Sequence, residues 1–393
     1  MLQSESQSDL TASATPLRLE LAQLSAASVT CGAHTVAFQP RNTKYPTEDR
    51  CLIEEWELPN GNWKFIGVFD GHGAGHEAVD FVVETLPGII KASLTSEIEA
   101  SDIILTSAIE RILVQCISEV DDRIKDDFCK FFPGGPDQIS KLSSDEIKTV
   151  IRDPETGYSF VQIMRARTGT TAIVAVIDPS KSLHIASLGD CDAVLGAKND
   201  VGNWEVKTLS KRHNASNEAE ANRIRSEHPD EVECIVQSRT LGLITLTRAI
   251  GDTLFKLPPI YTERILALST PPFHENYNIG ALLSRNITPP YLSNISEVEH
   301  VDLSSLSSDT TPMLILCSDG LSDLYSRRSH RSDISRDIEM WLTKSTPLGI
   351  DNLALSLLWD ALGGNEGLEM ASRLIKGIPG KRVDDTTVVV LQL

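Results

Sequence analysis

The most informative feature of this chain is the apolar run Phe65-Ile66-Gly67-Val68-Phe69, followed by Asp70-Gly71-His72-Gly73. A short apolar run bounded by turn-forming residues predicts a buried strand. The end of this strand would bring a carboxylate, a flexible backbone and an imidazole to one point. Such a strand end can place an oxygen ligand, a backbone carbonyl and a proton donor around a metal centre. The alternative is a plain turn after a strand, because Asp and Gly are common turn residues.

Three further acidic clusters favour the metal-site interpretation. The apolar run Leu314–Ser318 ends in Asp319-Gly320, Asp384-Asp385 opens a β-branched run, and Glu48-Asp49 lies upstream of the first motif. Acidic residues at the edges of several predicted strands indicate a converging set of oxygen ligands. Oxygen-only ligation favours Mg²⁺ or Mn²⁺ over Zn²⁺, which prefers His and Cys.

These motifs occur in an order that resembles the metal-dependent protein Ser/Thr phosphatases, the protein phosphatase 2C family. The matching pieces are Thr47-Glu48-Asp49, Val68–Gly73, Gly169–Ala172, Leu188-Gly189-Asp190, Thr247–Asp252, Cys317–Gly320 and Asp384–Val388. The resemblance covers roughly residues 30–393. Three further segments resemble the pyruvate dehydrogenase phosphatase branch of the family, namely His213–Glu218, Glu227-His228-Pro229 and Thr288–Leu292.

The resemblance implies an α+β fold, a β-sandwich of two mainly antiparallel sheets flanked by helix layers, with the metal site at one edge. It also implies hydrolysis of phosphoserine and phosphothreonine in proteins by a water that bridges two Mg²⁺ or Mn²⁺ ions. In that arrangement Asp70 bridges the metals, Asp319 and Asp384 complete one shell, and the Gly71 carbonyl serves the other. Glu48 acts through bound water, and Asp190 joins Asp319 at a looser third ion or is only a turn residue.

His72 adjoins these ligands, and its natural role is general acid to the leaving Ser or Thr alkoxide. Two other acids in the motifs have weaker claims to chemistry: we expect Asp252 to be structural and leave Asp49 open. Arg248 is expected to order a local carboxylate and not to bind substrate.

The chain departs from the family pattern at two positions. Many members have an Arg that grips the substrate phosphate where this chain has Lys44, which offers a point charge without the planar fork. Lys44 is then a weaker anchor, or Arg41 takes over. The family often has Gly-Asp-Ser-Arg where this chain has Gly189-Asp190-Cys191-Asp192. We therefore expect the ion pair of that Arg to be absent.

Composition limits the classes of partner. The formal net charge is −19, and 41% of the residues are hydrophobic. An acidic protein disfavours nucleic acid or an anionic membrane as a partner. The family resemblance implies a phosphoprotein substrate, and we expect a monomer. The seven cysteines are odd in number, without a Cys-x-x-Cys motif, which is typical of a reducing compartment. No cysteine has the setting of a tyrosine-phosphatase nucleophile.

Along the chain, residues 1–28 predict a flexible tail, and residues 29–393 predict one catalytic domain with insertions near 132–160 and 253–300. The first 30 residues contain three acids and one basic residue, Arg18, whereas a transit peptide should be Arg-rich. We expect a cytoplasmic protein, with the mitochondrial matrix as the alternative that the branch resemblance implies.

Two other functions stay open at this point. A pseudophosphatase, or scaffold module, would keep the fold without turnover, although the main ligand positions all retain Asp. A metal-dependent nuclease or small-molecule phosphatase would also use oxygen ligands, but it fits the acidic composition and the ordered motifs poorly.

Overall fold

The computed structural model describes residues 7–41, 46–101, 104–274, 277–306, 311–329, 333–344, 352–377 and 383–393. Lys44 lies outside these ranges, so its proposed role is not placed in the structure. Among the described residues, no helix is long and apolar enough to span a membrane.

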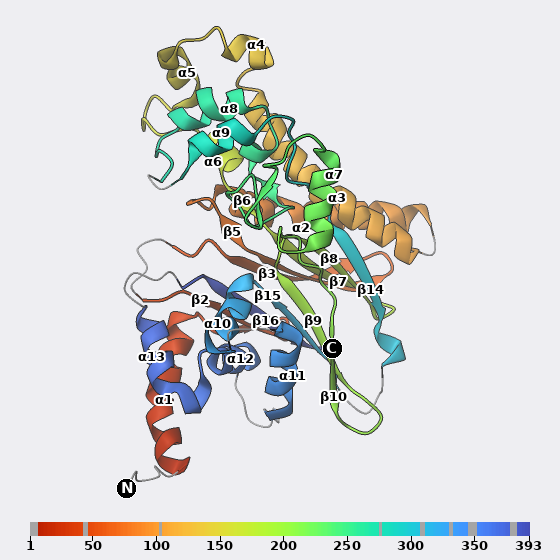
Figure 1. Ribbon diagram of the computed structural model, residues 1–393. Helices are drawn as coiled ribbons and strands as arrows, with labels where there is room; N and C mark the ends of the chain where they lie inside the picture. The colour runs from red at the N-terminus through yellow and green to blue at the C-terminus, as the bar shows by residue number, and fades with distance from the viewer. Residues whose placement is uncertain are drawn as a thin grey trace.

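Two antiparallel sheets pack face to face (Figure 1). The first has the order β1 (Ser28–Thr30), β2 (Ala33–Phe38), β16 (Thr386–Gln392), β15 (Met313–Cys317), β9 (Asp192–Lys198) and β10 (Trp204–Thr208). The second has the order β14 (Glu297–Asp302), β8 (Ser182–Leu188), β7 (Ala172–Ile177), β4 (Gly61–Phe69) and β3 (Arg50–Leu58). Ile66, Val68 and Ile173 of the second sheet share one buried cluster with Leu316 and Val389 of the first.

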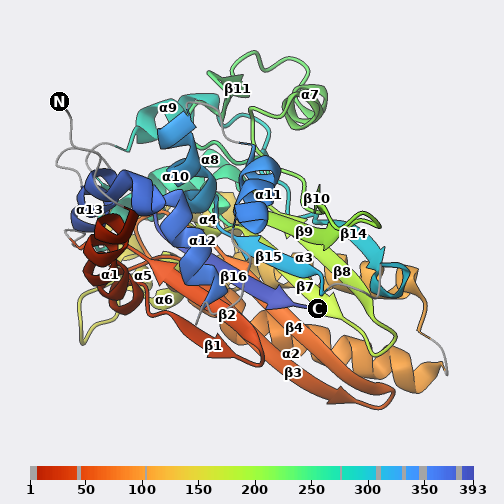
Figure 2. The ribbon, with the colours of Figure 1, turned by 90° about the horizontal axis from the view of Figure 1, so that it is seen from below.

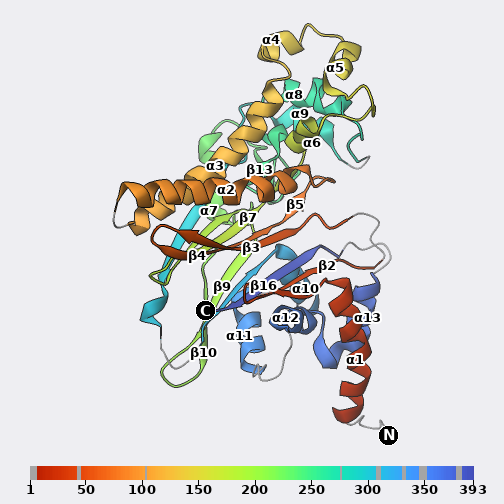
Figure 3. The same cartoon turned by 180° about the vertical axis from the view of Figure 1, so that it is seen from behind.

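Helices cover the outer face of each sheet, so the central strands are buried on both faces and read as continuous apolar runs. α2 (Glu77–Ala100) and α3 (Thr106–Cys129) pack on the β4 side (Figure 3). The opposite face carries α1 (Gln7–Leu24), α10 (Asp319–Ser329), α11 (Ile334–Lys344), α12 (Leu353–Ala361) and α13 (Leu368–Lys376) (Figure 2). The predicted sandwich with flanking helix layers is confirmed.

A helical lobe beside the sandwich has a buried cluster of its own. It contains α4 (Gly135–Ile139), α5 (Ser144–Ile151), α6 (Val161–Arg167), α7 (Glu218–Glu227), α8 (Pro259–Arg264), α9 (Ile279–Arg285) and the hairpin β11 (Ile235–Val236)–β12 (Arg239–Thr240). Phe128 near the end of α3 packs into this cluster, and Figure 1 shows the lobe at the upper end of the molecule. The two segments expected as insertions therefore contribute to one packed unit.

A small three-stranded sheet connects the lobe with the sandwich. Its order is β13 (Ile250–Gly251), β6 (Gly169–Thr170) and β5 (Gly71–His72). Because β5 follows directly after the end of β4, this small sheet carries the Asp70-Gly71-His72 motif away from the main sheet.

One expectation from the sequence needs correction. Residues 7–28 are not a loose tail: residues 7–24 form α1, and Leu21 of this helix is fully buried among α12 and α13 residues such as Leu358 and Leu374. The error arises because a polar composition hides a few apolar side chains whose burial depends on distant partners.

Candidate functional site

The acidic motifs predicted to converge do so at one edge of the sandwich. Asp70 follows β4, Asp319 begins α10 directly after β15, and Asp384 lies just before β16. Burial raises the pKa of Asp70 well above its ordinary value, and nearby carboxylates raise it further, those of Asp49, Asp319, Asp190 and Asp384. The five side chains therefore share one electrostatic neighbourhood.

Asp70 and Asp319 interact directly with each other. Their carboxyl groups share a hydrogen bond, and burial together with Asp190 and Asp384 raises the pKa of Asp319 well above its ordinary value. Gly320 allows the approach of α10 to the Asp384-Asp385 segment, because a Cβ at position 320 would clash with the Asp385 carbonyl oxygen. The close backbone contact brings Asp319 beside Asp384.

Glu48 and Asp49 enter the site from the segment before β3. Glu48 Oε1 accepts a hydrogen bond from the Gly75 backbone N–H at 2.7 Å, and the Glu48 N–H donates to Asp385 Oδ2 at 2.8 Å. Glu48 therefore ties the loop after His72 to the start of β16. Gly71, the predicted carbonyl ligand, lies against Glu48: a Cβ there would stand 2.5 Å from the Glu48 carbonyl oxygen.

Asp49 is buried at the seam between the sheets. Its Oδ2 accepts a hydrogen bond from Ser318 Oγ at 2.7 Å, while Oδ1 is buried without a hydrogen-bond partner. Burial, with a contribution from Asp385, raises the pKa of Asp49 to about 7 against the opposing Ser318 bond. An unpartnered buried carboxylate oxygen beside the other acids is a donor suited to a cation or to a water bound to one.

Asp190 lies in a turn that interacts with residues 212–214 through hydrogen bonds and charge. The Gly189 N–H donates to His213 Nδ1 at 3.2 Å, and the His213 N–H donates to the Gly189 carbonyl oxygen at 2.8 Å. The Asn214 side chain hydrogen-bonds to Asp190. Burial raises the pKa of Asp190, although the Arg212 guanidinium and this hydrogen bond oppose the shift.

His72 faces a carboxylate that the sequence assigned a structural role. His72 Nε2 lies 2.6 Å from Asp252 Oδ2, and the Asp252 side chain is only 4% exposed. Burial alone lowers the pKa of His72, but the charge and the hydrogen bond of Asp252, together with the charges of Asp190 and Glu48, leave the pKa raised. The structure therefore places Asp252 in direct contact with His72.

Gly169 makes the contact between His72 and Asp252 possible. The two residues lie in and after the outer strands of the small sheet, β5 and β13, with β6 between them. A Cβ on Gly169 would stand 2.5 Å from His72 Nε2 and would also overlap the Asp252 carboxylate. The Gly169-Thr170-Thr171 motif thus leaves room for a side-chain contact that spans 180 positions of sequence.

The sequence interpretation missed Asp323. It lies one helical turn after Asp319 on α10, so the two side chains share a face. Asp323 contributes to the raised pKa of Asp319, and burial together with Asp384 raises the pKa of Asp323 itself. The i, i+4 spacing from Asp319 was the signal that could have found it.

Of the two proposed phosphate anchors, Arg41 lies within the described residues and Lys44 does not. The Arg41 guanidinium is 62% exposed and forms an ion pair with Glu20 of α1, Nη2 to Oε1 3.0 Å. Arg212 is a cation whose charge acts on both Asp190 and Asp323, and it is held by Asp192. Arg327 also acts on Asp323.

The donor chemistry fits a hard divalent cation. The acids supply oxygen ligands, and their mutual repulsion is relieved by a cation of high charge. In the described part of the chain, however, no three His, Cys, Asp or Glu side chains stand in ligand-ready geometry. The structure thus shows buried and half-buried carboxylates that gather at one edge, whereas the assignment of each residue to a metal is a proposal.

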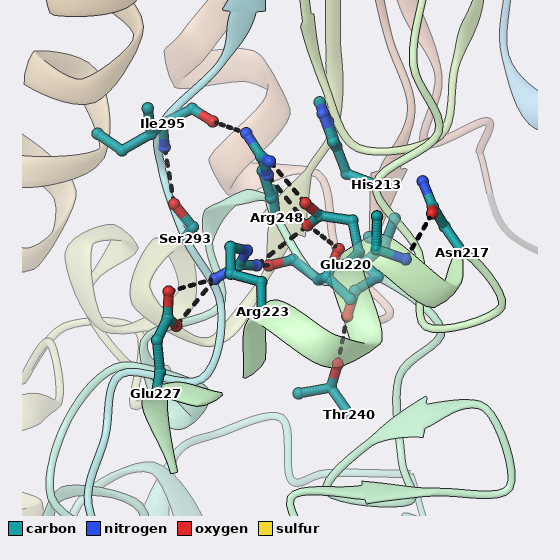
Figure 4. A network of polar contacts seen from close by, with 12 residues as sticks. His213, Asn217, Glu220, Arg223, Glu227, Thr240, Arg248, Ser293 and Ile295 are labelled. Carbon is teal, nitrogen blue, oxygen red and sulfur yellow. Dashed lines mark hydrogen bonds and ion pairs between the residues drawn. The ribbon is translucent and has the colours of Figure 1, made fainter. Parts of the chain in front are cut away.

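Arg248 orders carboxylates, as predicted, in a network at the base of the lobe (Figure 4). It donates to both oxygens of Glu220 on α7, at 3.0 and 2.6 Å, and to Glu297 of β14 at 2.9 Å. Arg223 and Thr247 also donate to Glu220 Oε2. These hydrogen bonds to the charged form lower the pKa of Glu220 to about 2 despite the opposing effect of burial. The network fixes α7 against the sandwich.

Two of the segments that resemble the pyruvate dehydrogenase phosphatase branch pack against each other. His228 Nδ1 lies 2.9 Å from Thr288 Oγ1, its Nε2 lies 3.2 Å from the Pro290 carbonyl oxygen, and its ring stacks on Tyr291 with 4.2 Å between centroids. These residues therefore build the lobe.

Comparisons with known proteins agree with this geometry. The protein phosphatase 2C family model matches residues 34–344. The mitochondrial [pyruvate dehydrogenase [acetyl-transferring]]-phosphatase 1 of Bos taurus is 33% identical over 208 residues, which cover 52% of this chain and 37% of that protein. A protein phosphatase 2C homolog of Schizosaccharomyces pombe is 25% identical over 369 residues, or 88% of this chain and 76% of that protein.

A solved structure supports the fold. The serine-threonine phosphatase 2C from Toxoplasma gondii aligns with a TM-score of 0.53 at 16% identity, covering 93% of this chain and 96% of that one. The match to the bovine enzyme spans only about a third of that enzyme's length. The family model covers most of the chain, and the chain belongs to the protein phosphatase 2C family.

Proposed function

We propose that this protein hydrolyses phosphoserine and phosphothreonine in proteins with the help of Mg²⁺ or Mn²⁺. The observation that carries the proposal is the meeting, at one edge of the sandwich, of mutually coupled carboxylates with the His72–Asp252 pair. Family membership supports the reaction class, and the acidic donor set supports the metal class.

The proposed metal ligands are Glu48, Asp70, Gly71, Asp319 and Asp384 for two ions, with Asp190 at a looser third. When bound, the metals would supply a water nucleophile and neutralise charge on the phosphoryl oxygens. Asp70 is the central ligand in this proposal, since its pKa responds to four of the other acids. Asp49 would act behind the ligands through its unpartnered oxygen.

His72 is proposed as the general acid, positioned by Asp252. Because Nε2 faces the Asp252 carboxylate, Nδ1 is the nitrogen that would carry the proton to the leaving alkoxide. The carboxylate favours the imidazolium, which is the form that a proton donor needs. Asp252 thus fixes both the orientation and the protonation of the ring.

The substrate and the compartment are finer proposals. Curated relatives are named mitochondrial pyruvate dehydrogenase phosphatases, and we extend to this chain the proposal of a phosphoserine on a dehydrogenase subunit as substrate. That substrate favours the mitochondrial matrix as the compartment.

The proposed function is tested by assaying the purified chain on a phosphoserine peptide before and after chelation. We expect chelation to abolish phosphate release and Mn²⁺ or Mg²⁺ to restore it. Full turnover in excess chelator, with metal loss verified by elemental analysis, would contradict the metal role. No turnover under any metal, with the fold intact, would instead identify a pseudophosphatase.

A further inference from the structure

Asp121 and Lys256 form a buried ion pair that no motif of the sequence identified. Asp121 lies on α3 and Lys256 lies after β13, with side chains 5% and 6% exposed and Nζ 2.7 Å from Oδ1. The same oxygen of Asp121 accepts a hydrogen bond from the Gly251 backbone N–H at 2.8 Å. Lys256 Nζ also donates to the Ala249 carbonyl oxygen at 2.7 Å. The pair therefore binds the backbone of the segment 249–252 at two points, Ala249 and Gly251.

This segment has a backbone conformation that needs outside support. Gly251 has φ +81°, and Asp252 follows with φ +50°, in the left-handed region that non-glycine residues seldom adopt. Such a conformation is unfavourable for a residue with a Cβ, and it persists where surrounding contacts determine it. The contacts are the Asp252 N–H to the Thr168 carbonyl oxygen, 2.9 Å, and the Gly251 N–H to Asp121.

The supported residue is the one that contacts His72. Asp252 Oδ2 reaches His72 Nε2 across Gly169 at 2.6 Å. A carboxylate at this distance orients the ring only if its own backbone is fixed, and a displacement of about 1 Å can cost two orders of magnitude in rate. A contact chain thus runs from α3 through Gly251 and Asp252 to His72.

We propose that Asp121 is a positioning residue for the proposed general acid: through Gly251 it fixes the Asp252 carboxylate that orients His72. The inference rests on the proposed function of His72. Lys256 keeps the Asp121 charge paired, so that a buried acceptor is present on α3 without an uncompensated charge. A purely structural ion pair would instead stabilise the fold and leave proton transfer untouched.

The experiment compares two substrates whose leaving groups differ in their need for a proton. A phosphoserine peptide requires protonation of its alkoxide, whereas p-nitrophenyl phosphate releases a stable phenolate. Asp121→Ala alone would leave Lys256 unpaired and could unfold the protein. The main variant is therefore Asp121→Ala/Lys256→Met, which removes both charges. Its matched partner, Asp121→Asn/Lys256→Met, keeps a neutral oxygen for the Gly251 N–H.

We expect the Ala/Met variant to lose at least about tenfold in kcat on the phosphoserine peptide and to stay within about twofold on p-nitrophenyl phosphate. The Asn/Met variant should recover most of the peptide activity. Asp122→Ala, the exposed neighbour on α3 that pairs with Lys125, controls for helix propensity and should match the unaltered protein on both substrates.

Equal losses on the two substrates in a folded Ala/Met variant, or no loss on either, would overturn the inference. His72→Ala is measured in parallel to separate this failure from that of the proposed function. If His72→Ala also lost activity equally on both substrates, the general-acid role itself would fall, and the inference with it. If only His72→Ala discriminated between the substrates, the inference alone would fall.

Discussion

Asp192 and Arg212 form a two-point ion pair beside the acidic edge, with Nη2 2.5 Å from Oδ2 and Nε 3.2 Å from Oδ1. The family often has an Arg at position 192, so the sequence predicted that its ion pair would be lost. The structure nevertheless has an ion pair at this position, in which Asp192 is the anion and Arg212 is the cation. The Asp192 side chain is only 2% exposed, and its charge is therefore compensated within the protein.

The first prediction concerns the stability of this pair. Arg212→Ala should lower the free energy of unfolding by about 2–4 kcal/mol, because it leaves the Asp192 carboxylate buried without its partner. Urea unfolding measures the change. The control is Arg212→Ala/Asp192→Ala, which removes both charges and should recover part of the loss. A double variant as unstable as the sum of the two single variants would show that the pair contributes no coupling.

The second prediction concerns Asp70. Asp70→Asn should lower kcat by several orders of magnitude, since the proposed central ligand would lose its charge while keeping its shape. Asp319→Asn and Asp384→Asn should weaken metal binding as well as rate, which calorimetric Mn²⁺ titration detects. A folded Asp70→Asn enzyme with nearly unaltered turnover would refute the ligand assignment.

The third prediction concerns the His72–Asp252 pair. His72→Ala should slow a phosphoserine peptide by roughly 10²–10⁴, the usual contribution of a general acid, and p-nitrophenyl phosphate much less. Asp252→Asn should show the same dependence on the leaving group with a smaller loss, because the ring remains present but less well held. If Asp252→Asn lowered both activities equally, Asp252 would be structural, as the sequence first indicated.

The fourth prediction concerns acid stability. His184 of β8 is fully buried opposite His300 of β14, with 4.9 Å between ring centroids and no hydrogen-bond partner on either nitrogen of His184. Burial, and then the neighbouring His300, lowers the pKa of His184 to about 4 from its ordinary 6.5. Between these two values the unfolded chain binds a proton that the folded chain does not.

Stability should therefore be complete above about pH 6.5 and should fall as the pH drops toward 4, by at most ~1.4 kcal/mol per pH unit from this group. The measurement is the difference in unfolding free energy between the unaltered protein and His184→Leu across this range. The comparison cancels the titration of the acidic edge, which both proteins share. A difference that is constant with pH would contradict the shifted pKa.

The fifth prediction concerns the substrate. A phosphorylated pyruvate dehydrogenase subunit should be dephosphorylated with a kcat/KM well above that of generic phosphoserine peptides. A C-terminal fluorescent tag on the chain would report its compartment independently. Equal kcat/KM values for the subunit and generic peptides would contradict this prediction. The segments that resemble the branch would then have a structural role in the lobe, where His228 and Tyr291 pack together.

Local sequence was sufficient for the strands and for the acidic edge. The run before Asp70 is a buried strand because one face meets the other sheet and the opposite face meets α2 and α3, so apolar residues occupy both faces. Asp70, Asp319 and Asp384 are each placed at a strand end by a pattern within about ten residues. Strand periodicity and turn residues are local properties, so they can be recognised in the sequence without knowledge of distant contacts.

Tertiary structure decided the contacts that join distant segments. Asp252 meets His72 only because β6 brings Gly169 between their strands, and Arg212 compensates Asp192 only because the segment after β10 returns to the Gly189 turn. Leu21 of α1 is buried by α12 and α13, which lie more than 300 positions later. Pairings of this kind depend on how the whole chain is folded, so no local pattern of residues specifies them.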